Sequence, residues 1–112
     1  MLISAISDEM SGGVAVADVM RLLSDPLRAR IVELLAAGPA CTCHLVEDTG
    51  AKQPNVSGHL RILRDTGLVV AAPHGRFTYY RLAPDVFQAA AVQLTELAAR
   101  ARANAGARRK CP

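Results

Sequence analysis

Apolar residues recur with a helical period in four successive segments of the chain: residues 14–24, 26–37, 41–49 and 53–65. In the last segment Val56, Leu60 and Leu63 stand at i, i+4 and i+7, which places them on one buried stripe of a helix. The breaks between the segments hold residues that end helices or begin new ones: Ser24-Asp25-Pro26, Gly38-Pro39 and Thr49-Gly50-Ala51. The pattern therefore predicts four short helices, the last two joined by a tight turn.

The period then changes to that of strands. Residues 68–72 and 77–82 are β-branched and aromatic runs on either side of Pro73-His74-Gly75-Arg76, which predicts a β-hairpin with an exposed basic tip. Pro84-Asp85 opens a last helix that runs to about Ala103 and is about 30 Å long. Four helices, a hairpin and a helix in this order predict a mainly α fold with a small β-hairpin, the winged helix-turn-helix.

The last helix has an apolar stripe that only a second copy of the chain could cover: Val86, Ala90, Leu94 and Leu97. Leaving it in water forfeits roughly 1.5–3 kcal/mol for each large side chain, so we expect a homodimer held by the first and last helices. The 112 residues are expected to form one domain. It spans residues 14–104, between a flexible amino-terminal arm (1–13) and a flexible basic tail (105–112).

The position of the charged residues along the chain is more informative than the net charge. The net charge is only +3, but residues 48–83 contain Lys52, Arg61, Arg64, Arg76 and Arg81 against only two acidic residues, Asp48 and Asp65. Such a local excess suits a polyanion such as DNA. The outer face of the helix over residues 53–65 is rich in hydrogen-bonding side chains, which is typical of a DNA-reading helix. An ordinary helical pair with a solvated polar face remains the alternative at this point.

Residues 53–69 resemble the recognition helix of the ArsR/SmtB family of metal-responsive repressors. Residues 24–31 and 75–82 resemble the second helix and the wing of that family, in the same order. The resemblance covers about residues 14–100 and implies a homodimer that binds a palindromic operator and leaves it when a metal or metalloid binds. It also implies that the chain is not an enzyme.

Seven residues are the candidate contacts to double-stranded operator DNA. Gln53, Asn55, Ser57 and His59 are expected to meet base edges or phosphates. Lys52, Arg61 and Arg76 are expected to meet phosphates and to make the affinity depend on salt.

Three cysteines, two of them one residue apart, are poor material for a disulfide framework, so we expect free thiols in a reducing compartment. No apolar run approaches the roughly 20 residues of a membrane span, and the amino terminus lacks a secretion signal. These features favour a cytoplasmic protein without membrane partners.

Cys41 and Cys43 stand where the arsenic-responsive members of the resembled family have Cys-x-Cys-x-x-Cys. Val46 takes the place of the third cysteine, and His44 replaces the usual aspartate. Soft thiolates select thiophilic ions, so the resemblance implies that As(III) or Sb(III) is the inducer, with no catalytic cofactor. The third ligand is expected to be Cys111, a small thiol or hydroxide. Residues i and i+2 lie about 200° apart on a helix, so either Cys41 precedes the helix or ligand binding unwinds its first turn.

Other interpretations of the thiol pair remain open. Oxidation of Cys41 and Cys43 would give a redox-switched repressor of the same fold. A Zn(II)- or Cd(II)-responsive repressor is a further alternative, although His44, adjacent to Cys43, is expected to point to a different side of the helix. The two thiols could also simply fill a helix junction. A thiol oxidoreductase is disfavoured, because the spacing is not Cys-x-x-Cys and no catalytic base accompanies it.

Overall fold

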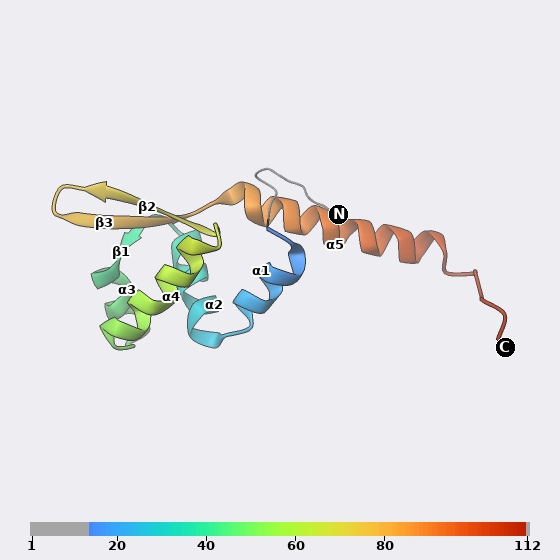
Figure 1. Ribbon diagram of the computed structural model, residues 1–112, viewed down its shortest axis with the longest axis horizontal. Helices are drawn as coiled ribbons and strands as arrows, with labels where there is room; N and C mark the ends of the chain where they lie inside the picture. Colours follow the sequence, from blue (N-terminus) through green and yellow to red (C-terminus); the bar gives the residue numbers. More distant parts are fainter. Residues whose placement is uncertain (1–13, 112) are drawn as a thin grey trace.

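The computed structural model describes residues 14–111. In chain order its elements are α1 (Val16–Leu23), α2 (Pro26–Ala36), β1 (Ala40–Cys41), α3 (Thr42–Thr49), α4 (Gln53–Asp65), β2 (Val69–His74), β3 (Phe77–Leu82) and α5 (Pro84–Ala103). The molecule is elongated, with extents of 62 × 28 × 23 Å. The β2–β3 hairpin and α5 follow one another along the long axis, and α1 to α4 lie together beside them (Figure 1). The predicted winged helix-turn-helix is confirmed.

The helix boundaries have local causes. The Asp25 side chain accepts a hydrogen bond of 3.0 Å from the Arg28 N–H and so caps α2, and Pro26 occupies the first helical position. Helix α3 ends at Gly50, whose φ of 74° lies in the left-handed region that glycine adopts without a steric cost. These are the breaks that the sequence predicted between the helices.

The core lies where α2, α3 and α4 meet the base of the hairpin. The predicted stripe of α4 is buried, since Val56 and Leu63 are fully buried and Leu60 is 1% exposed. Ile31 of α2 and Leu45 of α3 are also fully buried in the same cluster. The stripe therefore fixes which face of α4 turns inward and which faces solvent.

The sheet has three strands in the order β1-β3-β2, all antiparallel, where the sequence predicted only a hairpin. β1 is only two residues long, and it pairs Ala40 with Tyr80 and Cys41 with Tyr79. The hairpin turn is also shorter than expected, because Pro73 and His74 belong to β2. Proline is tolerated there because β2 is an edge strand, where a ladder N–H is not required.

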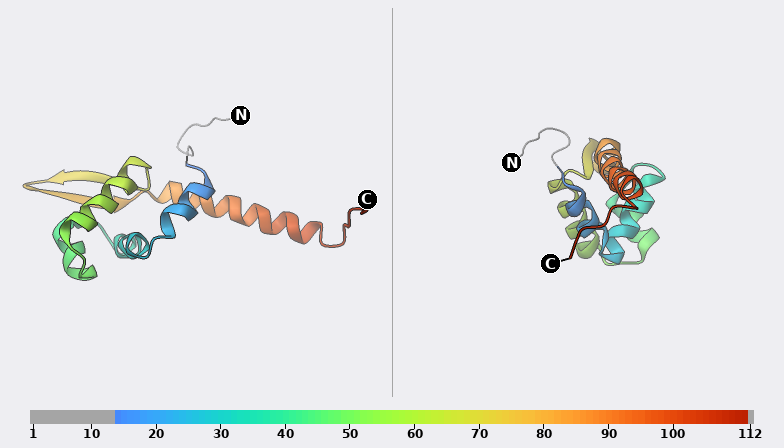
Figure 2. Two further views of the ribbon diagram at one scale, coloured as in Figure 1. Left: turned by 60° about the horizontal axis from the view of Figure 1, so that its bottom comes forward. Right: turned by 90° about the vertical axis from the view of Figure 1, so that its right-hand side faces the viewer.

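Helix α5 extends beyond the rest of the chain and packs along α1 near its own beginning (Figure 2). Ala90 is buried, and Val86 is half-buried against the core. Leu94 and Leu97 remain 46% and 49% exposed. The apolar stripe of this helix is thus divided, since its first half belongs to the chain's own core and only its second half lies open.

Two further expectations concern the ends of the chain and the membrane. Within residues 14–111, regular structure ends with α5 at Ala103, and the predicted arm over residues 1–13 lies outside the described residues. Among the described residues no helix is both long and apolar enough to cross a membrane.

Candidate nucleic-acid interface and thiol site

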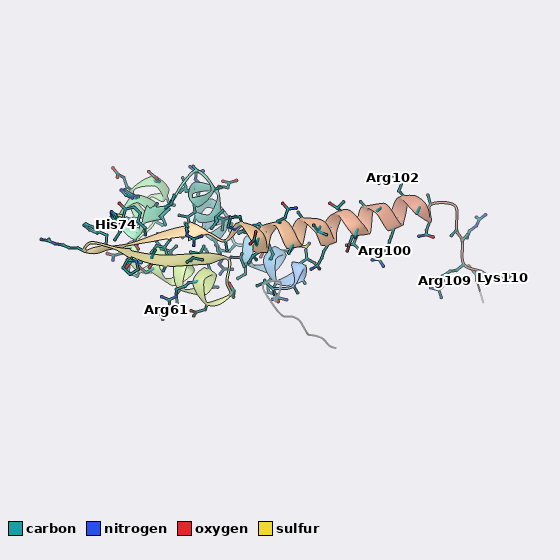
Figure 3. All side chains as sticks on the ribbon, turned by 90° about the horizontal axis from the view of Figure 1, so that it is seen from above. Arg61, His74, Arg100, Arg102, Arg109 and Lys110 are labelled. Carbon is teal, nitrogen blue, oxygen red and sulfur yellow. A yellow bond between two sulfur atoms is a disulfide. The ribbon has the colours of Figure 1, made fainter. Side chains whose placement is uncertain are left out.

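The outer face of α4 presents most of the predicted DNA contacts to solvent. Lys52 stands at the N-cap of the helix and Gln53 at its first position, and both are exposed. Asn55, Ser57 and Arg61 are exposed as well. Figure 3 shows Arg61 directed away from the body of the molecule. The burial of the opposite stripe places these five side chains where a partner can reach them.

His59 lies differently from the rest of this set. Its side chain is only 19% exposed, and its Nε2 lies 3.6 Å from Oδ1 of Asp25. Its Nδ1 accepts a hydrogen bond of 3.2 Å from Nε of Arg28, whose Nη1 also donates to the Leu22 carbonyl at 3.1 Å. His59 therefore connects α4 to the start of α2. The sequence pattern had suggested an exposed His59 on the DNA face, whereas the structure places it in these contacts.

The Asp25 carboxylate in this cluster has several stabilising partners. The backbone N–H of Arg28 donates to it and holds the pKa of Asp25 below its ordinary value, with the charges of His59 and Arg28 acting in the same direction. The ionised form of Asp25 is thus favoured while it caps α2 beside His59.

The hairpin presents its tip to solvent. Gly75 has a φ of 63°, which allows the tight reversal between β2 and β3, and Arg76 beside it is exposed. Arg76 therefore lies at the end of the wing.

Cys41 lies outside the helix, which resolves the geometric problem of the i, i+2 spacing. It ends β1 and is the N-cap of α3, in an extended conformation with φ −91° and ψ 169°. Cys43 lies in the first turn, with its Cα 5.5 Å from that of Cys41. In the structure the two sulfurs form a disulfide, whereas the sequence predicted two free thiols. The reason is that the extended N-cap turns the Cys41 side chain back towards the first turn.

His44 belongs to the same cluster, contrary to the expectation that it points elsewhere. Its Nδ1 lies 3.3 Å from the Sγ of Cys41 and accepts the Cys41 N–H, also at 3.3 Å. The ligand atoms of Cys41, Cys43 and His44 all lie within 4.8 Å of one another. The sequence-based expectation was wrong because it compared His44 with its neighbour Cys43 on a regular helix and did not consider its relation to Cys41 at the N-cap. The available signal was the i, i+3 relation of an N-cap residue to a polar residue, the capping-box spacing.

The thiol cluster is also in contact with the wing. Cys41 is paired with Tyr79 of β3, and the Tyr79 ring makes edge-on contacts with two histidine rings. The centroid distances are 6.1 Å to His44 and 5.6 Å to His74. The cluster thus touches both the helix-turn-helix and the hairpin.

Val46, at the place of the third cysteine of the resembled pattern, and Cys111, a candidate third ligand, differ in their access to the two thiols. Val46 and Cys43 line one hollow of about 280 Å³ together with Thr42, Glu47 and Gln53. Cys111 is a free, exposed cysteine in the carboxyl-terminal segment, at the end of the molecule opposite α3 (Figure 1). Within one chain Cys111 is therefore remote from the pair.

Known proteins are similar to this chain over its central part. Residues 25–70 match the family described as bacterial regulatory protein, arsR family. The arsenic resistance transcriptional regulator ArsR2 of Pseudomonas putida is 40% identical over 70 residues, which are 62% of this chain and 61% of that protein. The arsenical resistance operon repressor of Escherichia coli is 36% identical over 69 residues, or 61% of this chain and 59% of that protein. The similarity thus spans about 60% of either relative.

Solved structures extend the likeness to the fold. One, a possible transcriptional regulator for arsenical resistance, is 32% identical with a TM-score of 0.62, covering 69% of this chain and 80% of its own. Another is the homodimeric winged helix-turn-helix DNA-binding domain of a possible ArsR-family regulator from Mycobacterium bovis. It is 29% identical, has a TM-score of 0.60, and covers 85% of this chain and 87% of its own. These relatives are named as transcriptional regulators or possible transcriptional regulators. By sequence and by fold, the chain belongs to the arsR family of bacterial regulatory proteins.

Proposed function

We propose that this protein is a homodimeric transcriptional repressor that leaves a palindromic operator when As(III) or Sb(III) binds Cys41 and Cys43. The observation that supports this most directly is the convergence of the two sulfurs at the first turn of α3, the helix that packs against α4. The relatives named for arsenic resistance support the choice of metalloid. The donor set fits, since two thiolates are the ligands that a thiophilic ion prefers.

The DNA-bound state uses both copies of α4. Exposed polar side chains at the start of α4 are suited to base edges and phosphates, and Arg76 at the wing tip is suited to a neighbouring phosphate. A two-fold dimer then requires an inverted repeat with half-sites about one helical turn or a multiple apart. His59 holds α4 against α2 and contributes by positioning that helix.

Release follows from the place of Cys41 in the chain. Because Cys41 ends β1 and caps α3, drawing its sulfur into a ligand site with Cys43 displaces the start of α3 and the helix packed on it. Taking a repressor from almost fully bound to almost fully released needs a differential of about 5.5 kcal/mol. Coordination by two thiolates is of sufficient strength to supply it.

The test is operator binding by single-cysteine variants under reducing conditions. Cys41→Ser and Cys43→Ser should each bind operator DNA like the unaltered protein but show no release by arsenite. Cys111→Ser is the matched control and should respond nearly normally. Fluorescence anisotropy of labelled operator gives both quantities. Full release of either of the first two variants would refute the site, and an unresponsive Cys111→Ser would identify Cys111 of one of the two copies as a ligand.

A second candidate is favoured by the disulfide between Cys41 and Cys43. With hydrogen peroxide as the oxidant, the exposed Cys43 thiolate attacks one peroxide oxygen and releases hydroxide. The Cys41 thiolate then displaces hydroxide from the resulting sulfenic acid, which closes the disulfide. Release of the operator by peroxide without arsenite, reversed by dithiothreitol, would favour this redox switch over the metalloid.

A further inference from the structure

We propose that Arg28 is a positioning residue for operator recognition, and that it acts through the neutral imidazole of His59 on α4. This inference rests on the proposed function in one respect, namely that α4 of this chain binds operator DNA. It goes further by naming the contact that fixes the orientation of α4 in the free protein. It also makes operator binding depend on the protonation of one histidine.

Arg28 is connected to three segments of the chain at once. Its Nε donates to Nδ1 of His59 at 3.2 Å, and its Nη1 donates to the Leu22 carbonyl near the end of α1 at 3.1 Å. Its backbone N–H donates to the carboxylate of Asp25, the N-cap of α2. Arg28 and His59 are both half-buried. A guanidinium holds its donors in a fixed planar geometry, so these bonds set the position of His59, and with it one face of α4, relative to α1 and α2.

The direction of these bonds identifies the protonation state of His59. A guanidinium can only donate hydrogen bonds, so Nδ1 of His59 is the unprotonated nitrogen that accepts. The proton of the neutral ring is then on Nε2, which lies 3.6 Å from Oδ1 of Asp25. The hydrogen bond between Arg28 and His59 therefore exists only while the imidazole is neutral.

Protonation of His59 removes this hydrogen bond. A second ring proton on Nδ1 would meet the Nε–H of Arg28, so that two donors and two positive charges face each other across the 3.2 Å contact. Asp25 stays ionised meanwhile, because the backbone N–H of Arg28 holds the pKa of its carboxyl below the ordinary value. Asp25 then attracts the imidazolium from the Nε2 side, and α4 loses its bond to Arg28.

In the described part of the chain, the charged and titratable groups in hydrogen-bond or ion-pair contact with His59 belong to α2 and its N-cap. They are Arg28 and Asp25, although α3 and β2 also pack against α4. The sign of the pH effect is therefore specific. A positive charge gained by any histidine would strengthen binding to DNA phosphates, whereas loss of the Arg28 contact weakens operator binding on acidification.

The experiment measures DNA binding by the reduced, full-length protein at about pH 7.5 and about pH 5.5, across the range in which histidine titrates. The probe is a labelled duplex with the inverted repeat that the unaltered protein selects from random-sequence DNA. A duplex of shuffled sequence measures non-specific binding. Arg28→Met removes the guanidinium, and Arg30→Met is the matched control, since Arg30 is exposed on the same helix and pairs with Glu33. His59→Gln keeps one acceptor and one donor but cannot be protonated.

At the higher pH we expect Arg28→Met to bind the operator roughly 10-fold more weakly than Arg30→Met, as for the loss of one hydrogen bond from a charged donor. The two variants should bind the shuffled duplex equally. The unaltered protein should bind the operator more weakly at the lower pH, whereas His59→Gln should show no such loss. This pH comparison decides the question even if Arg28→Met does not fold.

Two results would overturn the inference: equal operator affinity in folded Arg28→Met and Arg30→Met, or the same response to acid in His59→Gln and the unaltered protein. Failure of the unaltered protein to select any inverted repeat is a different outcome. It would refute the proposed function itself, and this inference with it.

Discussion

At the scale of single residues, Val46 is where this chain departs from the three-cysteine pattern that it resembles. Val46 lines the same hollow as Cys43 and packs against the core. A thiol at position 46 would therefore face the Cys43 side of the site. We predict that Val46→Cys raises arsenite affinity, because a third soft ligand replaces hydroxide or an external thiol. The free energy of unfolding should fall by only about 0.5–1.5 kcal/mol, as for the loss of a buried methyl group.

Calorimetric titration of the reduced protein with arsenite measures this affinity. Val46→Ser is the matched control, since it has a side chain of similar size to cysteine without the sulfur. Its affinity for arsenite should stay at or below that of the unaltered protein. An equal affinity in Val46→Cys and Val46→Ser would show that position 46 cannot reach the metalloid.

At the scale of elements, α4 contains a glycine, which lowers the stability of a helix. Gly58 lies in the middle of this helix, three residues from both Asn55 and Arg61, on the proposed DNA face. Its surroundings are open, because apart from the neighbouring residues and the backbone of α4 itself no atom lies within 4 Å of the position of an added Cβ. We predict that Gly58→Ala raises the free energy of unfolding by up to about 1 kcal/mol, the difference in helix propensity. It should at the same time weaken operator binding, because the methyl group keeps the helix from close approach to DNA.

Thermal unfolding and operator titration together measure these two opposed effects. Thr95→Ala provides the control, since it improves helix propensity at an exposed position of α5, outside the proposed DNA face. It should raise stability without a change in DNA affinity. Unchanged operator affinity in Gly58→Ala would mean that the α4 backbone does not approach the DNA at this point.

At the scale of the whole molecule, the second half of α5 exposes an apolar surface that the proposed homodimer would cover. Leu94 and Leu97 lie open on a helix that extends beyond the rest of the chain, and Met20 of α1 is 57% exposed. Figure 3 shows Arg100 and Arg102 further along the same helix. We predict that Leu94→Glu is monomeric, because a charge would be buried in the apolar contact between the two copies. Without the dimer, operator affinity should collapse as well.

Sedimentation velocity determines the oligomeric state. Thr95→Glu is the matched control, since it introduces the same charge about 100° around the helix axis from Leu94 and should remain dimeric. A dimeric Leu94→Glu with unchanged sedimentation would place the interface elsewhere on the molecule.

What the sequence determined by itself was the order of the five helices and the hairpin, and the inward face of α4. The stripe of Val56, Leu60 and Leu63, the helix break at Ser24-Asp25-Pro26 and the turn at Gly50 all act within a few residues of the chain. Their effects are local, because burial at i, i+3 and i+4 and the geometry of helix ends depend on near neighbours. The exposed positions of α4 and the wing tip followed from the same local rules.

Only the tertiary structure decided how distant residues meet. The two-residue strand β1 has no periodicity of its own, and it exists because β3 pairs Cys41 with Tyr79. That pairing holds Cys41 in an extended conformation outside α3, which brings its sulfur to Cys43 and to the ring of His44. In the same way, the packing of α4 on α2 turns His59 inward to Asp25 and Arg28. Contacts between segments far apart in the chain arise from packing of the whole core, so no local pattern of residues could specify them.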